Sequence, residues 1–250
     1  MLYMKKLILH IPHSATNIPF KNGYILSDEI IQNEILKLTD WYTDDLFSSE
    51  IDDRIVAKFS RVFCDPERFE DDKNEPMSKK GMGVLYEKTD TGEIMREITP
   101  KLRTKILDKF YWKHHQKLND AVNQQLEKYG KAIIIDCHSM SNIPFIRDIN
   151  QESIRTDYSI GTDLFHTNEE LHMKTMNFFL DRDIEVAINS PYSGTIVPME
   201  HYKRNENVQS IMIEVNRRLY LKENSNIKSE NYPVVKRLLQ DYLEEIRQLL

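Results

Sequence analysis

This sequence has few cysteines, no long apolar run and no surplus of basic residues. Only Cys64 and Cys137 occur among its 250 residues, so we expect no disulfide framework and favour a reducing cytoplasm. No apolar run approaches the ~20 residues that a membrane-spanning helix needs. The formal net charge of −6 argues against a general nucleic-acid binder. We therefore expect a cytoplasmic protein that engages neither a membrane nor nucleic acid.

Internal repeats, low-complexity linkers and Gly/Ser hinges are also missing. Hydrophobic residues make up 40% of the chain and charged residues 30%, which suits a globular protein with an ample core. A chain of 250 residues fits one large domain. We predict a single domain over residues 1–250.

The most informative stretch is an apolar run that ends in Asp136, Cys137 and His138. Residues 131–136 are too short and too uniformly apolar for a surface helix, and they predict a buried strand. Residues two apart on a strand point to the same side, so Asp136 and His138 should emerge together at its carboxyl end. Cys137 should point the other way, as a thiol in the core. Open α/β sheets bind their ligands at this edge.

Further strands are expected over residues 7–11, 61–65, 185–188 and 210–215. Helices are expected over residues 27–49, in one piece or two, and over 99–129, 167–180 and 231–250. Residues 141–156 are expected to form a loop. Strands separated by helices predict an α/β fold. We expect a three-layer α/β/α sandwich with a mixed central sheet, as in phosphorylase- and hydrolase-like folds.

His13 follows the first expected strand and would bring a second imidazole to the same crevice as His138. His10 lies three residues earlier, faces the other side of a regular strand, and is interpreted as a packing histidine. A catalytic zinc site usually has three protein ligands and one open position. Asp40 is the preferred third ligand, with Asp44 as the alternative; both could instead belong to a solvated acidic face.

Glu214 interrupts the apolar strand 210–215, where an unpaired charge would be costly. It could pair with a neighbouring arginine, or serve as a general base beside a metal site. Three arginines near the ends of the expected strands could bind a substrate carboxylate through their planar guanidinium groups, or form ordinary salt bridges; these are Arg61, Arg68 and Arg217.

Two further segments could line the crevice. Asn189 and Tyr192 follow the strand at 185–188, where a turn could present them to a substrate or have a purely structural role. Residues 66–93 are rich in charge, glycine, proline and methionine, and irregular segments of this length are often lids or binding loops. Residues 66–93 could therefore form a lid that closes over the substrate, or a binding loop.

Seven segments, in the same order, resemble the N-formylglutamate amidohydrolase family. They are His-Ile-Pro-His-Ser-Ala-Thr (10–16), Asp-Trp-Tyr-Thr-Asp-Asp-Leu-Phe (40–47), Asp-Pro-Glu-Arg-Phe (65–69), Glu-Pro-Met-Ser-Lys-Lys-Gly-Met-Gly-Val (75–84), Ile-Asp-Cys-His-Ser-Met (135–140), Asn-Ser-Pro-Tyr-Ser-Gly (189–194) and Ile-Glu-Val-Asn-Arg (213–217). Each segment is short, but the ordered set extends over most of the chain.

The resemblance implies a carboxypeptidase- and aspartoacylase-like zinc hydrolase, with one Zn²⁺ per chain or another divalent ion. Its substrate would be a small N-acyl amino acid such as N-formyl-L-glutamate. Carried over by motif, His13 and His138 match metal ligands and Glu214 matches the general base. The three arginines match positions that would bind a substrate carboxylate and polarise the carbonyl of the scissile amide. Arg68 is assigned to catalysis. The alternatives are a different N-acyl amino acid or small peptide, or a metal-binding relative without activity.

Two positions depart from the expected pattern. The carboxypeptidase pattern has a glutamate three residues after the first histidine, and Thr16 stands there instead. The third ligand must therefore come from elsewhere in the chain. Thr195 replaces a glycine expected after the Pro-Tyr pair, and it could narrow the substrate pocket.

Overall fold

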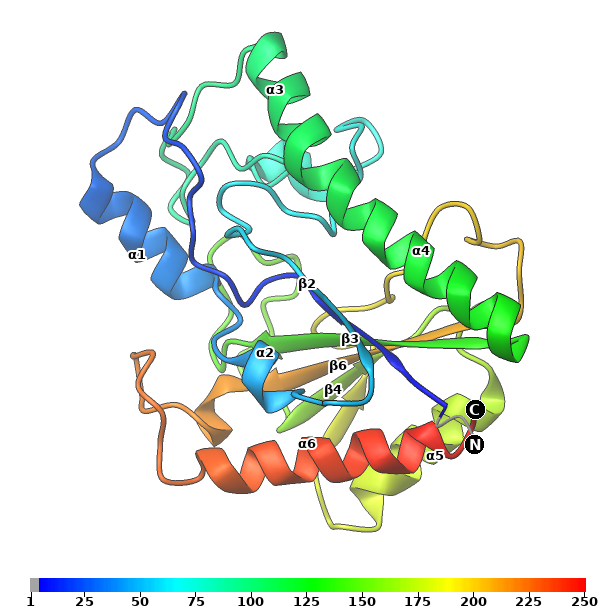
Figure 1. Cartoon of the computed structure of the whole chain (residues 1–250). Coiled ribbons are helices and arrows are strands. Elements are labelled where there is room, and N and C mark those ends of the chain that lie inside the picture. Colours follow the sequence, from blue (N-terminus) through cyan, green and yellow to red (C-terminus); the bar gives the residue numbers. More distant parts are fainter. Residues whose placement is uncertain (1–4) are drawn as a thin grey trace.

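A mixed six-stranded sheet forms the centre of the protein, and helices cover both of its faces (Figure 1). The computed structural model describes residues 5–250. The strands are β1 (Ile8–Ile11), β2 (Asp53–Val56), β3 (Ala132–Met140), β4 (Tyr158–Gly161), β5 (Val186–Ile188) and β6 (Val208–Asn216), in the spatial order β2-β1-β3-β6-β4-β5. All neighbours are parallel except β4 and β6. The predicted α/β sandwich with a mixed sheet is confirmed.

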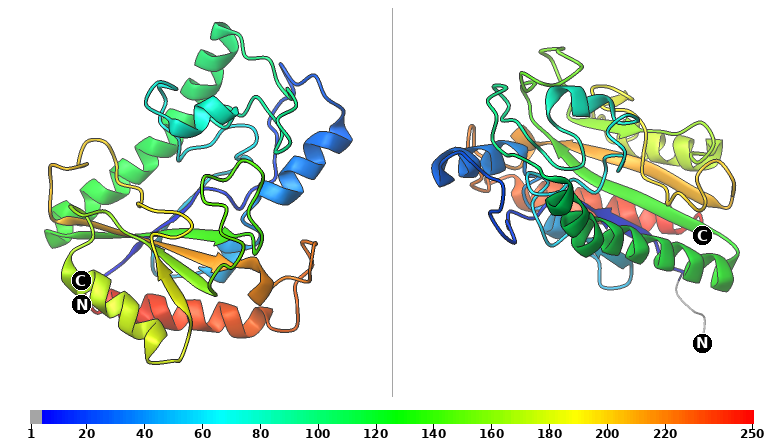
Figure 2. Two further views of the ribbon diagram at one scale, coloured as in Figure 1. Left: turned by 180° about the vertical axis from the view of Figure 1, so that it is seen from behind. Right: turned by 90° about the horizontal axis from the view of Figure 1, so that it is seen from above.

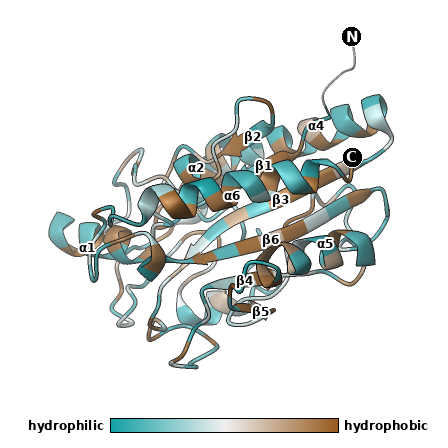
Figure 3. Ribbon diagram, turned by 90° about the horizontal axis from the view of Figure 1, so that it is seen from below, coloured by the Kyte–Doolittle hydropathy of each residue, from teal (hydrophilic) through white to brown (hydrophobic). Residues whose placement is uncertain are grey.

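Helices lie on the two sides of this sheet (Figure 2). They are α1 (Asp28–Leu38), α2 (Thr43–Leu46), α3 (Pro100–Ile106), α4 (Trp112–Tyr129), α5 (Glu169–Leu180) and α6 (Tyr232–Arg247). Helix α4 contacts β1, β2 and β3 on one face, while α5 and α6 contact each other on the opposite face. Figure 3 shows α6 with alternating apolar and polar bands, as expected for an amphipathic helix that packs on a sheet.

The alternation of side chains along β3 decides where the polar residues at its end can go. Ile133, Ile135 and Cys137 belong to the core cluster shared with α5 and α6, which confirms the predicted core thiol. Ile134 packs with α4 residues on the other face. Asp136 and His138 share its parity, so they lie on the α4 side of the sheet.

Two predicted helix boundaries have clear chemical causes. The Thr99 side chain accepts a hydrogen bond from the backbone N–H of Leu102 at the start of α3, and Gly130 ends α4 with φ of 72°. Between α3 and α4 the chain makes one π-helical turn (Leu107–Tyr111), so the two helices are continuous. Helix α5 begins as expected, although its cap is Asn168 and not Thr167.

Two local predictions need correction. Residues 61–65 form a turn and not a strand, because Phe63 N–H and Cys64 N–H both donate to the Ser60 carbonyl. Strands β2 and β4 were not expected, because their sequences Asp-Arg-Ile-Val and Tyr-Ser-Ile-Gly contain no run of apolar residues. The region 27–49 contains two helices, α1 and α2, which is one of the two predicted arrangements, with Asp40 in the connection between them.

The long segment 66–93 is irregular apart from one 3₁₀ turn, η1 (Pro76–Lys80). Its later part is packed into the protein, since Val84, Leu85 and Tyr86 are buried. Its exposed part covers residues 69–74, and the whole-segment lid stays a prediction. No helix within residues 5–250 is long and apolar enough to cross a membrane.

Candidate active site

The carboxyl ends of the parallel strands β1, β3 and β6 meet at one edge of the sheet, where three predicted site residues come together. His138 is opposite Glu214 in the register of β3 and β6, and His10 is opposite Asp136 in the register of β1 and β3. Strand β1 stops at Ile11, and the chain beyond Pro12 carries His13 to the same place. His13, His138 and Glu214 are all at most 5% exposed.

The two predicted metal-ligating histidines are paired. The ring centroids of His13 and His138 lie 5.1 Å apart. His13 Nε2 is 2.8 Å from Asp65 Oδ1, and His138 Nε2 is 3.1 Å from Asp136 Oδ1. Each Nε2 therefore already has a carboxylate partner. His13 Nδ1, by contrast, is buried and has no hydrogen-bond partner.

Asp40 faces the Nδ1 atoms of this histidine pair. Its Oδ2 lies 3.0 Å from His138 Nδ1 and 3.6 Å from His13 Nδ1, while Oδ1 accepts a 2.8 Å hydrogen bond from Arg217. Burial alone would raise the pKa of Asp40, but interactions with His13, His138 and Arg217 hold that pKa below its usual range. The two histidines are therefore bracketed by carboxylates: Asp40 on the Nδ1 side, and Asp65 and Asp136 on the Nε2 side.

Glu67 is a carboxylate in this cluster that sequence reasoning missed. Its Oε2 lies 3.0 Å from His138 Nε2 and 3.7 Å from His13 Nε2. Two residue sets within residues 5–250 have potential ligand atoms that all lie within 4.8 Å of one another. One is His13, Glu67 and His138, and the other is His10, Glu67 and Asp136. Glu67 falls within the motif Asp-Pro-Glu-Arg-Phe, so its presence there was the available signal.

Glu214 projects from β6 into the same cluster as a carboxyl without a strong partner. The residue is 5% exposed, and its Oε2 has no hydrogen-bond partner. The pKa of Glu214 is raised to about 8: burial raises it most, the charge of His138 opposes the shift, and the charge of Asp40 adds to it. A carboxyl with these properties can take up and release a proton near neutral pH.

The three predicted arginines all reach the cluster, but they differ in how fully they are engaged. Arg61 donates to Asp65 and Tyr86, and Arg217 donates to Asp40, Ser139 and the Lys37 carbonyl. Arg68 is the least engaged: its Nε is buried without a hydrogen-bond partner, and its closest carboxylate oxygens, from Glu75 and Asp65, are 3.8 and 3.9 Å away.

Three other predicted candidates are placed differently. Asp44 is exposed in α2 and does not share a helical face with Asp40, which precedes that helix. Asn189 has a positive φ of 54°, and its side chain holds the backbone N–H and hydroxyl of Thr162, which is a structural role in a turn. Tyr192 donates to Asp148, and burial raises the pKa of its hydroxyl, with the charges of Asp148 and Glu214 adding to the shift.

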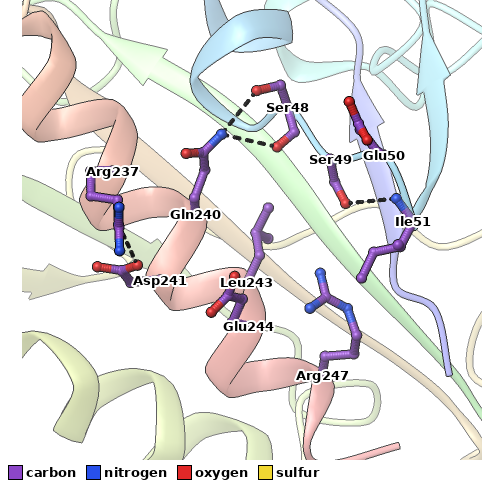
Figure 4. A pocket seen from close by; sticks show the side chains of 10 residues that line it. All are labelled: Ser48, Ser49, Glu50, Ile51, Arg237, Gln240, Asp241, Leu243, Glu244 and Arg247. Carbon is purple, nitrogen blue, oxygen red and sulfur yellow. Dashed lines mark hydrogen bonds and ion pairs between the residues drawn. The ribbon is translucent and has the colours of Figure 1, made fainter. Parts of the chain in front are cut away.

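Two surface hollows have linings that contain none of the residues of the histidine cluster. One hollow of about 400 Å³ lies between residues 48–51 and α6, and its lining contains none of the cluster residues (Figure 4). Its charged side chains are engaged locally, since Arg237 pairs with Asp241 and Arg247 pairs with Asp52. A second hollow, of about 510 Å³, is lined by Asn189, Thr162 and Lys203 among others. Neither lining contains His13, His138 or Glu214.

Comparisons with known proteins bear on the family and the fold. A family model described as N-formylglutamate amidohydrolase matches residues 5–221. The solved structure of an N-formylglutamate amidohydrolase from Ralstonia eutropha JMP134 is 22% identical, with a TM-score of 0.84, over 98% of this chain and 94% of that one. A gene product from Agrobacterium tumefaciens is 15% identical, with a TM-score of 0.68, over 98% of this chain and 90% of that one. No curated protein sequence matches the chain.

Proposed function

Because the chain belongs to the N-formylglutamate amidohydrolase family, we propose that it is a zinc-dependent hydrolase of an N-formyl amino acid such as N-formyl-L-glutamate. The products would be formate and the free amino acid. The observation that carries this proposal is the buried cluster in which two histidines, Asp40 and Glu214 meet at the carboxyl edge of the sheet.

The donor set fits a zinc ion on the Nδ1 side of the histidine pair. A metal there would use His13 Nδ1, the buried nitrogen that lacks a hydrogen-bond partner, together with His138 Nδ1 and Asp40. It would leave both Nε2 atoms with their carboxylates, the usual arrangement for metal-bound imidazoles. When bound, zinc lowers the pKa of a water molecule towards ~7 and acts as a Lewis acid.

Glu67 offers the alternative third ligand, on the Nε2 side. That arrangement would leave His13 Nδ1 buried and unsatisfied, which costs about 1–3 kcal/mol. It would also place the cation where Asp65 already accepts from His13. We therefore favour Asp40 as the third ligand.

Glu214 would accept a proton from the attacking water and return it to the leaving amine. In the metal-free protein its pKa is about 8, which is close to neutral pH, where a general base exchanges protons most effectively. Its Oε2 makes no hydrogen bond within the protein, so this oxygen would be available to the water molecule.

Arg68 is the arginine best suited to the substrate, because its buried Nε has no hydrogen-bond partner. It would polarise the scissile carbonyl or hold a carboxylate of the amino acid. Arg61 and Arg217 fix Asp65 and Asp40, and their predicted contact with substrate would come through their remaining N–H groups. Tyr192, close to Glu214, would border the same space.

We further propose that the chain is one domain that acts on its small-molecule substrate in the cytoplasm, where the buried free thiols of Cys64 and Cys137 would stay reduced.

A panel of substrates tests the proposal and its rivals. The zinc-loaded protein should release the acid from N-formyl-L-glutamate faster than from N-acetyl-L-glutamate, larger N-acyl amino acids or small peptides. A preference for another compound of the panel would change the assigned substrate but leave the proposed amide hydrolysis in place. Zinc binding with no turnover on any member would favour a metal-binding relative without activity.

A further inference from the structure

A second group of ligand atoms lies beside the proposed zinc site, deeper under α4. His10 Nδ1 is 2.8 Å from Asp136 Oδ1 and 3.4 Å from Glu67 Oε1. The potential ligand atoms of these three residues all lie within 4.8 Å of one another. Imidazole nitrogens and carboxylate oxygens bind zinc at about 2.0–2.2 Å, so separations of this size between donors suit a single ion among them.

The ring of His10 is oriented by a hydrogen bond at Nε2. His10 Nε2 lies 2.8 Å from Nε2 of His114, a buried residue of α4, and one of these two nitrogens must donate to the other. When neutral His10 donates through Nε2, its Nδ1 lone pair points at the oxygens of Asp136 and Glu67. Three electron-rich atoms that face one another need a positive charge between them, which either a proton on Nδ1 or a metal ion supplies.

The ion pairs around the cluster show which carboxylates have a permanent cation. Asp40 pairs with Arg217, and Asp65 pairs with Arg61. Among the ion pairs found within residues 5–250, Glu67 and Asp136 have only histidines as partners. Buried carboxylates are normally paired with a cation or bound to a metal.

Glu67 is placed to join the two sites. Its Oε1 faces His10 Nδ1, while its Oε2 is 3.0 Å from His138 Nε2. The far oxygen of Asp136 accepts a 3.1 Å hydrogen bond from the backbone N–H of Ile196, which fixes that carboxylate in place. The two acids therefore come from separate segments and meet on one imidazole.

We propose that His10, Glu67 and Asp136 bind a second divalent cation of the zinc, cobalt or manganese class, next to the metal held by His13, His138 and Asp40. This inference rests on the proposed function, because it takes the first metal to occupy the Nδ1 side of His138. The second ion neutralises the two carboxylates that lack an arginine and fixes Glu67 beside the catalytic centre.

Metal content tests the second site directly. The full-length protein is stripped with a chelator, equilibrated with micromolar zinc, and assayed for zinc per chain by mass spectrometry. Wild type should bind two zinc ions, and His10→Gln and Asp136→Asn should each bind one. His115→Gln is the matched control, because His115 contacts the Pro66 carbonyl and belongs to neither ligand set; it should keep both ions. Circular dichroism would establish that the variants are folded.

Manganese gives a second measurement that does not need a variant. Two Mn²⁺ ions bound by adjacent ligand sets should give a spin-coupled electron paramagnetic resonance signal in wild type. A single zinc in wild type, lost in His13→Gln but kept in His10→Gln, together with an uncoupled manganese signal, would overturn the second site and leave the proposed function standing. A proton on His10 would then occupy the space between the carboxylates. No zinc in any of these proteins would count against both proposals.

Discussion

His13 Nε2 lies 2.8 Å from Asp65 Oδ1, and both residues are at most 1% exposed. Asp65 is fixed in turn by Arg61, by the hydroxyl of Tyr86 and by the backbone N–H of Glu67. A carboxylate held this firmly keeps the proton of His13 on Nε2, and so leaves Nδ1 free to bind a metal. The orientation of one ligand is thus set by a residue that does not contact the proposed zinc.

Asp65→Asn should weaken zinc binding while leaving the fold intact. Loss of an outer partner of a ligating histidine typically costs about 10- to 100-fold in metal affinity, and we expect an effect of that size. Competition with a fluorescent chelator would measure it. The exposed Asp71→Asn serves as a control in the same segment, and zinc affinity equal for both variants would contradict the orienting role.

Asp40→Asn should lower zinc affinity by more than the roughly 100-fold expected for an outer partner, because it removes a ligand of the first site. Asp44→Asn is the natural control, since that carboxylate is exposed on α2. Titration of the stripped proteins with zinc would compare the two. If Asp40→Asn bound the first zinc as tightly as wild type, while Glu67→Gln lost it, the Nε2-side arrangement would be correct.

Glu214→Gln should stabilise the metal-free protein more strongly as pH rises. Burial raises the pKa of Glu214 from 4.5 to about 8, so between these values the folded state holds a proton that the unfolded state has released. Wild type therefore loses stability across this window, while the glutamine variant has no proton to lose at this position. Each pH unit there changes the free energy of unfolding by up to about 1.4 kcal/mol.

Urea unfolding of both chelator-treated proteins at pH 5 and pH 8 would measure the difference. The two curves should lie closest at pH 5, with the gap in unfolding free energy wider at pH 8. A gap that stays constant across this range would show that Glu214 titrates near its ordinary pKa.

The segment 66–93 should be cut by proteases within residues 69–74, because this part is exposed while Val84, Leu85 and Tyr86 are buried. If the exposed part closes over the substrate, saturating N-formyl-L-glutamate should slow that cleavage. Limited proteolysis of the zinc-loaded Glu214→Gln variant, which would hold substrate without consuming it, measures the effect. Equal cleavage rates with and without ligand would exclude a lid.

The sequence predicted those parts of the fold that have a strong local signal. The strand ending in Asp136 and His138, the capped helices and the mixed sandwich all follow from apolar periodicity and chain punctuation. The four-residue strands β2 and β4 have no such signal, and pairing with their neighbours defines them. The turn at residues 61–65 resembled a strand because its apolar residues are buried by tertiary packing.

The clustering of His13, His138 and Glu214 was predictable, because each of these polar residues interrupts an apolar strand or follows its end. Glu67 could not be placed from its spacing, since it lies in an irregular segment whose path depends on packing against Tyr111 and Tyr86. The surroundings of His10 required the register of β1 with β3, which brings Asp136 beside it, and the position of α4, which supplies His114.

Formate release from N-formyl-L-glutamate, measured together with zinc content for wild type and Glu214→Gln, tests the account most directly. We predict steady release by zinc-loaded wild type, and a rate lower by at least ~100-fold in a variant that retains its zinc, because general acid–base catalysis contributes about that much or more. A Glu214→Gln variant that releases formate at the wild-type rate, with the same zinc content, would contradict the account.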